Sequence, residues 1–407
     1  MKKFTIIALV TLFVTNFTLF LGWIPIGVLI PQAIFLLLFF VFRPDVFVSK
    51  TMIFYYIFFL YEMTIRAVYG VGYDWVVVVA RFLVMAVPLL ISTALFSSKG
   101  IKDCKGVSKY VLIVSFVTLL LSIRVLQIDG NALRLASFAN STGDMAELYK
   151  YWQQGMAEYG MAAMMAFMPA VLVYCFKSSQ QKKVRFFSIV GIIVVLYFMF
   201  LGQVTTTLIL CVMVSLISCL NFNNKALTII GVALMAIFVF TQFSGIMNFA
   251  ISLSGDSAMG GNFTSIAGVA SGEELDDATD AGIRVGLLFQ TINAFISNPL
   301  FGNPAIENGQ HNYFLDWLAT VGIIGCLPFF MLIWNQFKIV SSYLSNEAKK
   351  YYQIILWFFI LLGLIKNMSG PEYWDYLFIY YPAILVWIDS TKKKNSLIQN
   401  KDYANSL

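Results

Sequence analysis

The sequence predicts an all-α, polytopic membrane protein with about twelve transmembrane helices in a single integral membrane domain, residues 1–407. Hydrophobic residues make up 59% of the chain and charged residues 12%, against about 45–50% and about 25% in soluble domains. Apolar windows of about 17 to 23 residues, each able to cross a hydrocarbon core of about 30 Å as a helix, recur along the chain. Lys and Arg collect in alternate connections between them.

The first window has a basic start and an apolar middle, like a signal peptide. No small-x-small cleavage site precedes the second window, so we expect the first to be kept as an uncleaved span. The others follow from apolar length alone, with connections that are mostly short. The predicted spans lie near residues 4–22, 24–42, 51–69, 75–97, 109–127, 156–176, 186–202, 204–220, 226–248, 313–334, 352–366 and 374–390.

Orientation follows from the basic residues of the short loops. Placing both termini in the cytoplasm puts 20 of the 27 Lys and Arg residues on that side. The net charge of +6 is then a result of topology and does not indicate a nucleic-acid partner. These twenty are Lys2, Lys3, Arg43, Lys50, Lys99, Lys102, Lys105, Lys109, Lys177, Lys182, Lys183, Arg185, Lys225, Lys338, Lys349, Lys350, Lys392, Lys393, Lys394 and Lys401.

The seven remaining cations lie on external loops or in the outer halves of spans, where insertion rules disfavour them. Local pairing is one explanation, since Glu62 and Arg66 are four residues apart on one helix face. For the set as a whole, we expect a basic pocket that binds an anionic ligand from the outer leaflet, because arginine binds phosphate through two donors at once. The seven are Arg66, Arg81, Arg124, Arg134, Lys150, Arg284 and Lys366.

Two external loops are long, about 128–155 and 249–312, and loops of this length are usually functional or disordered. The second contains an acidic run, residues 273–280, which we interpret as solvated; a divalent-metal site is the alternative. The first contains Tyr149, Tyr151 and Trp152, which suit an interfacial aromatic belt or, alternatively, a surface on which sugar rings stack. No His/Cys cluster predicts a metal site.

The second long loop ends at His311, the only histidine of the chain. His311 and Asn312 precede the tenth span, where free amide donors and the helix dipole favour an anion. Arg284 lies earlier in the same loop, in an amphipathic segment that ends at the turn "NPLFG", residues 298–302. Further on, Gly322 and Gly325 are small residues that we expect to let another helix approach closely.

This pattern resembles the O-antigen polymerase and O-antigen ligase superfamily. In that family an Arg opens a short external helix, then come an "NPLFG"-like turn, His-Asn, nine residues, Gly, two residues and Gly. All of these are present here. The close similarity covers about 42 residues, from Arg284 to Gly325, and the layout of about twelve spans with a large loop between helices 9 and 10 extends it along the chain.

The resemblance implies a GT-C-like fold and a metal-independent glycosyltransferase without a cofactor, dependent on a polyprenyl-pyrophosphate donor. It implies that His311 contacts or deprotonates the acceptor hydroxyl and that Arg284 binds the pyrophosphate. Relatives carry a Ser-Arg pair at the outer end of the eighth span, where this chain has Gln203. A second phosphate-binding cation is therefore expected elsewhere. The candidates for binding the pyrophosphate or glycan are Arg134 first, then Arg81, Arg124 and Arg66, with Asn312 and Tyr313 beside the histidine.

The function expected from this resemblance is O-antigen polymerisation in the bacterial inner membrane, with the active site facing the periplasm. The donor is an undecaprenyl-pyrophosphate-linked oligosaccharide and the acceptor is another lipid-linked repeat unit; membrane lipid and a chain-length regulator are the other expected partners. A ligase that uses lipid A-core as acceptor is one alternative. A transporter or flippase of lipid-linked oligosaccharide is the second, although it should carry cations at several depths.

Overall fold

The computed structural model describes residues 29–72, 74–136, 145–220, 243–255, 258–270, 280–306, 311–367 and 369–404. Within these ranges the protein is built from helices, with no β-strand. The principal elements are α3 (Leu29–Phe42), α4 (Pro44–Phe47), α5 (Lys50–Val68), α6 (Trp75–Leu95), α7 (Cys104–Ile128), α9 (Met145–Gln153), α10 (Tyr159–Met165), α11 (Met168–Ser178), α12 (Lys182–Leu201), α13 (Thr205–Cys219), α15 (Phe243–Ser254), α16 (Ala258–Ala270), α17 (Asp280–Ser297), α18 (Tyr313–Ser341), α19 (Asn346–Ile365), the π-helical segment η3 (Tyr376–Tyr380) and α20 (Tyr381–Ala404).

Seven helical segments are long and apolar enough to cross a membrane, so the expected all-α membrane fold is confirmed at this level. They are Lys50–Val68, Val77–Leu95, Ile101–Ile128, Tyr159–Ser178, Lys182–Leu201, Tyr313–Ser341 and Asn346–Ile365, and each overlaps a predicted span. The shorter apolar helices Gln32–Phe42 and Thr205–Cys219 overlap two more.

The total of twelve spans stays a prediction, because the structure, in the residues it describes, does not show a spanning helix for each of the remaining windows. The window at 4–22 and most of that at 226–248 lie outside the described residues. The last window, 374–390, is the π-helical segment followed by the start of α20. The described parts of the long loop at 249–312 include α16 and α17.

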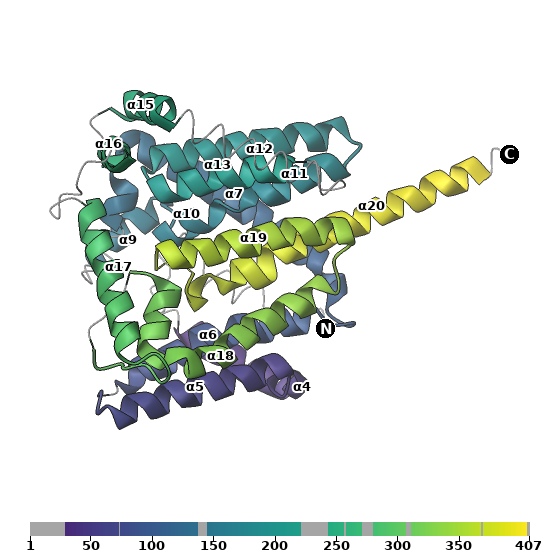
Figure 1. Cartoon of the computed structure of the whole chain (residues 1–407). Helices are drawn as coiled ribbons and strands as arrows, with labels where there is room; N and C mark the ends of the chain where they lie inside the picture. Colours follow the sequence, from purple (N-terminus) through teal and green to yellow (C-terminus); the bar gives the residue numbers. More distant parts are fainter. Residues whose placement is uncertain are drawn as a thin grey trace.

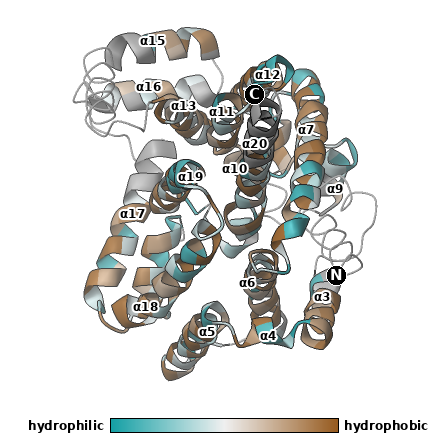
Figure 2. Cartoon of the chain, turned by 90° about the vertical axis from the view of Figure 1, so that its right-hand side faces the viewer, coloured by the Kyte–Doolittle hydropathy of each residue, from teal (hydrophilic) through white to brown (hydrophobic). Residues whose placement is uncertain are grey.

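The long helices are rich in apolar residues (Figure 2), and many of these side chains are exposed on the surface of the bundle, as lipid contact requires. Leu60 on α5, Ile113 on α7, Ile193 on α12 and Trp357 on α19 are all exposed. Soluble monomers rarely expose so many large apolar side chains. The core between the helices is aromatic-rich, and Trp374, just before the π-helical segment, is fully buried in it.

The antiparallel course of the chain separates two ends of the bundle (Figure 1). At the basic end α6 and α18 finish and α7, α12 and α19 begin, and the predicted cytoplasmic loops with their lysines lie there. At the other end α5 and α7 finish and α6 and α18 begin; we call this the cavity end. Helix α17, green in Figure 1, lies across the cavity end and packs on α18.

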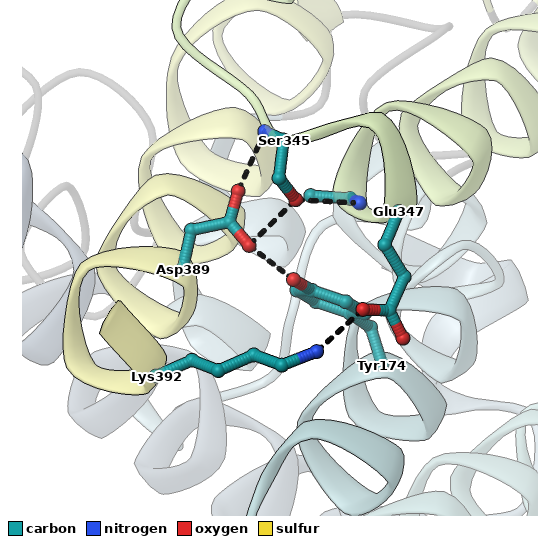
Figure 3. A network of polar contacts seen from close by, with 6 residues as sticks. Tyr174, Ser345, Glu347, Asp389 and Lys392 are labelled. Carbon is teal, nitrogen blue, oxygen red and sulfur yellow. Dashed lines mark hydrogen bonds and ion pairs between the residues drawn. The ribbon is translucent and has the colours of Figure 1, made fainter. Parts of the chain in front are cut away.

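A polar network fixes three helices at the basic end (Figure 3). Asp389 of α20 accepts hydrogen bonds from the Tyr174 hydroxyl of α11 and from the backbone N–H and hydroxyl of Ser345, at 2.7 and 2.8 Å from Ser345. The Ser345 hydroxyl in turn accepts from the N–H of Ala348 and caps α19. The buried carboxylate is thereby satisfied, and it ties α11, α19 and α20 together.

A second, uncharged network lies around Gln336 of α18, also toward the basic end, where α5 begins and α6 and α18 finish. Its side-chain oxygen accepts from Thr51 of α5 at 3.1 Å, and its amide donates to Ser92 of α6. Hydrogen bonds between buried side chains of different helices stabilise membrane bundles. This network sets α18 against α5 and α6, the three helices that line the candidate site.

Candidate functional site

Helix α18 is broken at Gly322, where φ is +66° and ψ is −175°, a conformation that is essentially restricted to glycine. The turn at residues 298–302 fits into the break. The N–H groups of Ile323 and Ile324 donate to the carbonyls of Pro299 and Leu300 at 2.9 and 3.1 Å. The N–H of Asn303 donates to the Ala319 carbonyl at 2.9 Å. Carbonyl and amide groups freed by the kink are therefore satisfied by the turn, as membrane burial demands.

Two glycines meet back to back in this junction. A Cβ atom on Gly302, where φ is +75°, would lie 2.4 Å from the Gly322 nitrogen, and one on Gly322 would lie 2.4 Å from the Leu300 oxygen. The expected helix approach is found at the other glycine of the motif, since a Cβ on Gly325 would lie 2.4 Å from the ring of Tyr61 on α5. Gly322 has a different role from the one expected: it allows the kink that receives the turn.

The His-Asn pair lies immediately before α18, as the sequence predicts. Asn312 is buried; its backbone N–H donates to Asp316 at 2.9 Å, and its side-chain amide donates to the Leu364 carbonyl of α19 at 2.7 Å. The backbone N–H of Asn312 is thus bound by a carboxylate of the same helix. The other oxygen of Asp316 accepts from Thr291 at 3.0 Å. Asp316 thus links the His-Asn turn to α17, the helix that carries Arg284.

A cavity of about 580 Å³ opens at this end of the bundle, between α5, α6 and the first turns of α18. Two of the predicted cations, Arg66 and Arg81, line it together with Tyr313. Its polar lining is completed by Asp316, Thr320 and Asn367, which lie beside an apolar wall that includes Trp317. The lining does not include His311 or Asn312, which lie on the turn just before Tyr313.

The two cavity arginines are held by one carboxylate. Glu62 of α5 accepts from Arg66 at 3.0 Å and from Arg81 of α6. The guanidinium of Arg81 also lies over the ring of Trp317 on α18, 5.9 Å from its centroid. The local pairing of Glu62 with Arg66 that the sequence suggested is confirmed, but it is shared with Arg81. Both guanidinium groups remain partly exposed, so their other N–H donors are available to a ligand.

The other sequence candidates lie apart from this cavity or outside what is described. Arg124 is exposed near the end of α7, and Arg134 lies half-buried in a helical segment at residues 132–136; neither lines the cavity. Arg284 is on α17, within its first turns, and only its backbone is described. Gln203 adopts a positive φ of 53° and donates to the Gly130 carbonyl at 3.5 Å.

Sequence reasoning missed three contributors to the site. Asp316 and Thr320 were not singled out, although both are polar residues in the first two turns of an apolar span. Trp317 was hidden among the many aromatic residues of the chain. Among the described residues no group of three His, Cys, Asp or Glu side chains could hold a metal ion. The acidic run proposed as the alternative metal site falls almost entirely outside the described ranges.

The arrangement is suited to binding a phosphate-bearing, partly apolar molecule at the membrane boundary, because two bidentate donors face a cavity with one apolar wall. No protein-family model matches the chain, and no curated protein matches it either.

Proposed function

We propose that this protein is a metal-independent glycosyltransferase that acts on polyprenyl-pyrophosphate-linked glycans, with O-antigen polymerisation as its activity. The observation that carries the proposal is the arginine-lined cavity beside the His-Asn turn, at the end of the bundle opposite the lysine-rich loops. Those loops are expected in the cytoplasm. The cavity is then at the periplasmic face of the bacterial inner membrane, where lipid-linked repeat units are expected.

The proposed reaction forms one glycosidic bond and breaks one sugar–phosphate bond. His311 takes the proton of an acceptor hydroxyl, and that oxygen attacks the anomeric carbon of the donor glycan. The lipid pyrophosphate leaves with the electron pair of the broken bond. Arg66, Arg81 and Arg284 stabilise the charge that grows on it, a role for which positioned guanidinium groups are suited without a metal ion. Arg81 replaces Arg134 as the first candidate for the second phosphate-binding cation, because it lines the cavity.

Two alternative functions, a ligase and a flippase, would use the cavity differently. A ligase would use the same donor chemistry with lipid A-core as the acceptor. A flippase would need cations along the whole path, whereas the described spanning helices carry Lys and Arg only within about two turns of their ends. This distribution favours chemistry at one face.

The test uses a strain in which the gene for the protein has been deleted and in which single-residue variants are expressed. We expect His311→Ala and Arg284→Ala proteins to insert normally and to make no polymer, seen as loss of the surface-polysaccharide ladder on a gel. Lys102→Ala is a matched control, since Lys102 is exposed in a lysine-rich loop at the basic end and does not line the cavity. A normal ladder from either site variant would contradict the catalytic assignment.

The acceptor is tested in the strain without the protein. A polymerase deletion should leave lipid A-core that carries a single repeat unit. Loss of every capped core would instead identify a ligase, and accumulation of repeat units on the cytoplasmic leaflet would identify a flippase.

A further inference from the structure

Glu62 is a buried acid in a membrane helix, and such residues usually mark functional sites. Its side chain is 2% exposed. One oxygen, Oε1, accepts from both Arg66 and Arg81, while Oε2 has no hydrogen-bond partner in the described part of the chain. A single carboxylate oxygen therefore fixes the separation of two guanidinium groups that come from different helices.

Stabilising the fold is not enough to explain this arrangement. Buried ion pairs are weak stabilisers, because the desolvation of the charges offsets their attraction. The three side chains together carry a charge of +1, two guanidinium groups less one carboxylate. The two cations line both the 580 Å³ cavity and a second one of about 200 Å³, and Glu62 lines only the second. The carboxylate thus lies behind the arginines, away from the larger cavity.

We infer that Glu62 is a positioning residue that presents Arg66 and Arg81 as one preformed cradle for the two phosphates of the lipid-linked substrate. The inference rests on the proposed function, since that function supplies the pyrophosphate. With Nε of Arg66 and one terminal nitrogen of Arg81 bound to Glu62, the other guanidinium N–H groups of both residues remain as donors. Holding them at a fixed separation lowers the entropy lost when a pyrophosphate binds.

The experiment measures inorganic pyrophosphate binding by calorimetry to the full-length protein in lipid nanodiscs, and the kinetics of glycan transfer from a lipid-linked repeat unit. The variants are Glu62→Gln, which keeps the shape and removes the charge, and Glu62→Asp, which keeps the charge and shortens the reach. Glu347→Gln is the matched control, because this substitution removes the same charge at the basic end, where Glu347 pairs with Lys392 at 2.6 Å.

The sign of the affinity change separates positioning from simple neutralisation. Removing a nearby negative charge should tighten anion binding by Coulomb attraction alone. If Glu62 positions the arginines, both Glu62 variants bind pyrophosphate roughly tenfold more weakly and raise KM for the donor more than they lower kcat. The Glu347→Gln protein should match the wild type in both measurements.

Tighter or unchanged pyrophosphate binding by Glu62→Gln overturns the inference and leaves the proposed function in place. Unchanged binding by Glu62→Asp also overturns it, and this variant keeps the test decisive if the neutral one does not fold. A third outcome separates the two proposals. If the wild-type protein binds pyrophosphate, both Glu62 variants bind it more weakly, and the wild-type protein transfers no glycan, then the positioning role stands and the proposed transferase activity is wrong.

Discussion

Replacing Gly322 with alanine should open the junction between the turn at 298–302 and α18. The φ of +66° with ψ of −175° is a conformation that costs a non-glycine residue about 1–3 kcal/mol. The added Cβ would also lie 2.4 Å from the Leu300 oxygen and 2.5 Å from the Gly302 nitrogen. Both are backbone atoms, so the overlap adds about 1–3 kcal/mol of overpacking. The sum, about 2–6 kcal/mol, raises the local opening constant by about 30-fold to about 2 × 10⁴-fold.

Cys326 reports this opening, because it lies one turn beyond Gly322 and is 1% exposed. In a background with the other four cysteines replaced by alanine, the labelling rate of Cys326 with a thiol reagent follows the population of the open state. We expect Gly322→Ala to label at least 30-fold faster than its parent. Gly106→Ala on α7 is the matched control, since its Cβ would meet nothing within 4 Å.

If Cys326 in the Gly322→Ala protein is labelled at the parent rate, the turn does not hold the break in α18 in the way the hydrogen bonds indicate. A rate increase in the Gly106→Ala control of the same size would show that the assay reports global rather than local opening.

Three further outcomes are expected. Thr291→Val removes the hydrogen bond to Asp316 and should lower transfer activity several-fold, while the free energy of unfolding falls by only about 0.5–1.5 kcal/mol. Transfer activity equal to that of the wild type would show that the link between α17 and α18 does not position the site. Asp389→Ala leaves Tyr174 and Ser345 without their acceptor and should lower the melting temperature with a loss of about 1–3 kcal/mol per group, but leave KM unchanged, since the network is at the basic end. EDTA should leave the activity of purified protein intact, and strong inhibition would redirect attention to the acidic run at 273–280.

The all-helical membrane architecture was accessible from the sequence because lipid imposes a local rule. Each span must be long and apolar in itself, so windows such as 186–202 and 313–334 coincide with helices without knowledge of their neighbours. The pairing of Glu62 with Arg66 was accessible for the same reason, since residues four apart meet on one helix.

Which residues line the cavity could not be predicted from the sequence. Seven cations were expected at one face; among those whose side chains the structure describes, Arg66 and Arg81 line the cavity, while Arg124 is exposed and Arg134 lies apart. Which of them meet depends on the packing and rotation of α5 and α6, and these contacts leave no periodic trace in the sequence. The role of Gly322 was also predicted wrongly. The sequence does not distinguish a glycine that lets another helix pack closely from a glycine that allows a kink in its own helix.

By itself, the sequence determined the helical membrane class, the separation of lysine-rich loops from outlying arginines, and the order of Arg284, the "NPLFG" turn, His311 and the two glycines. The tertiary structure alone decided that Arg81 shares the carboxylate of Glu62 and that the turn fills the break in α18. The first set follows from rules that act over a few residues. The second depends on contacts between residues 16 or more positions apart, which only the packed bundle brings together.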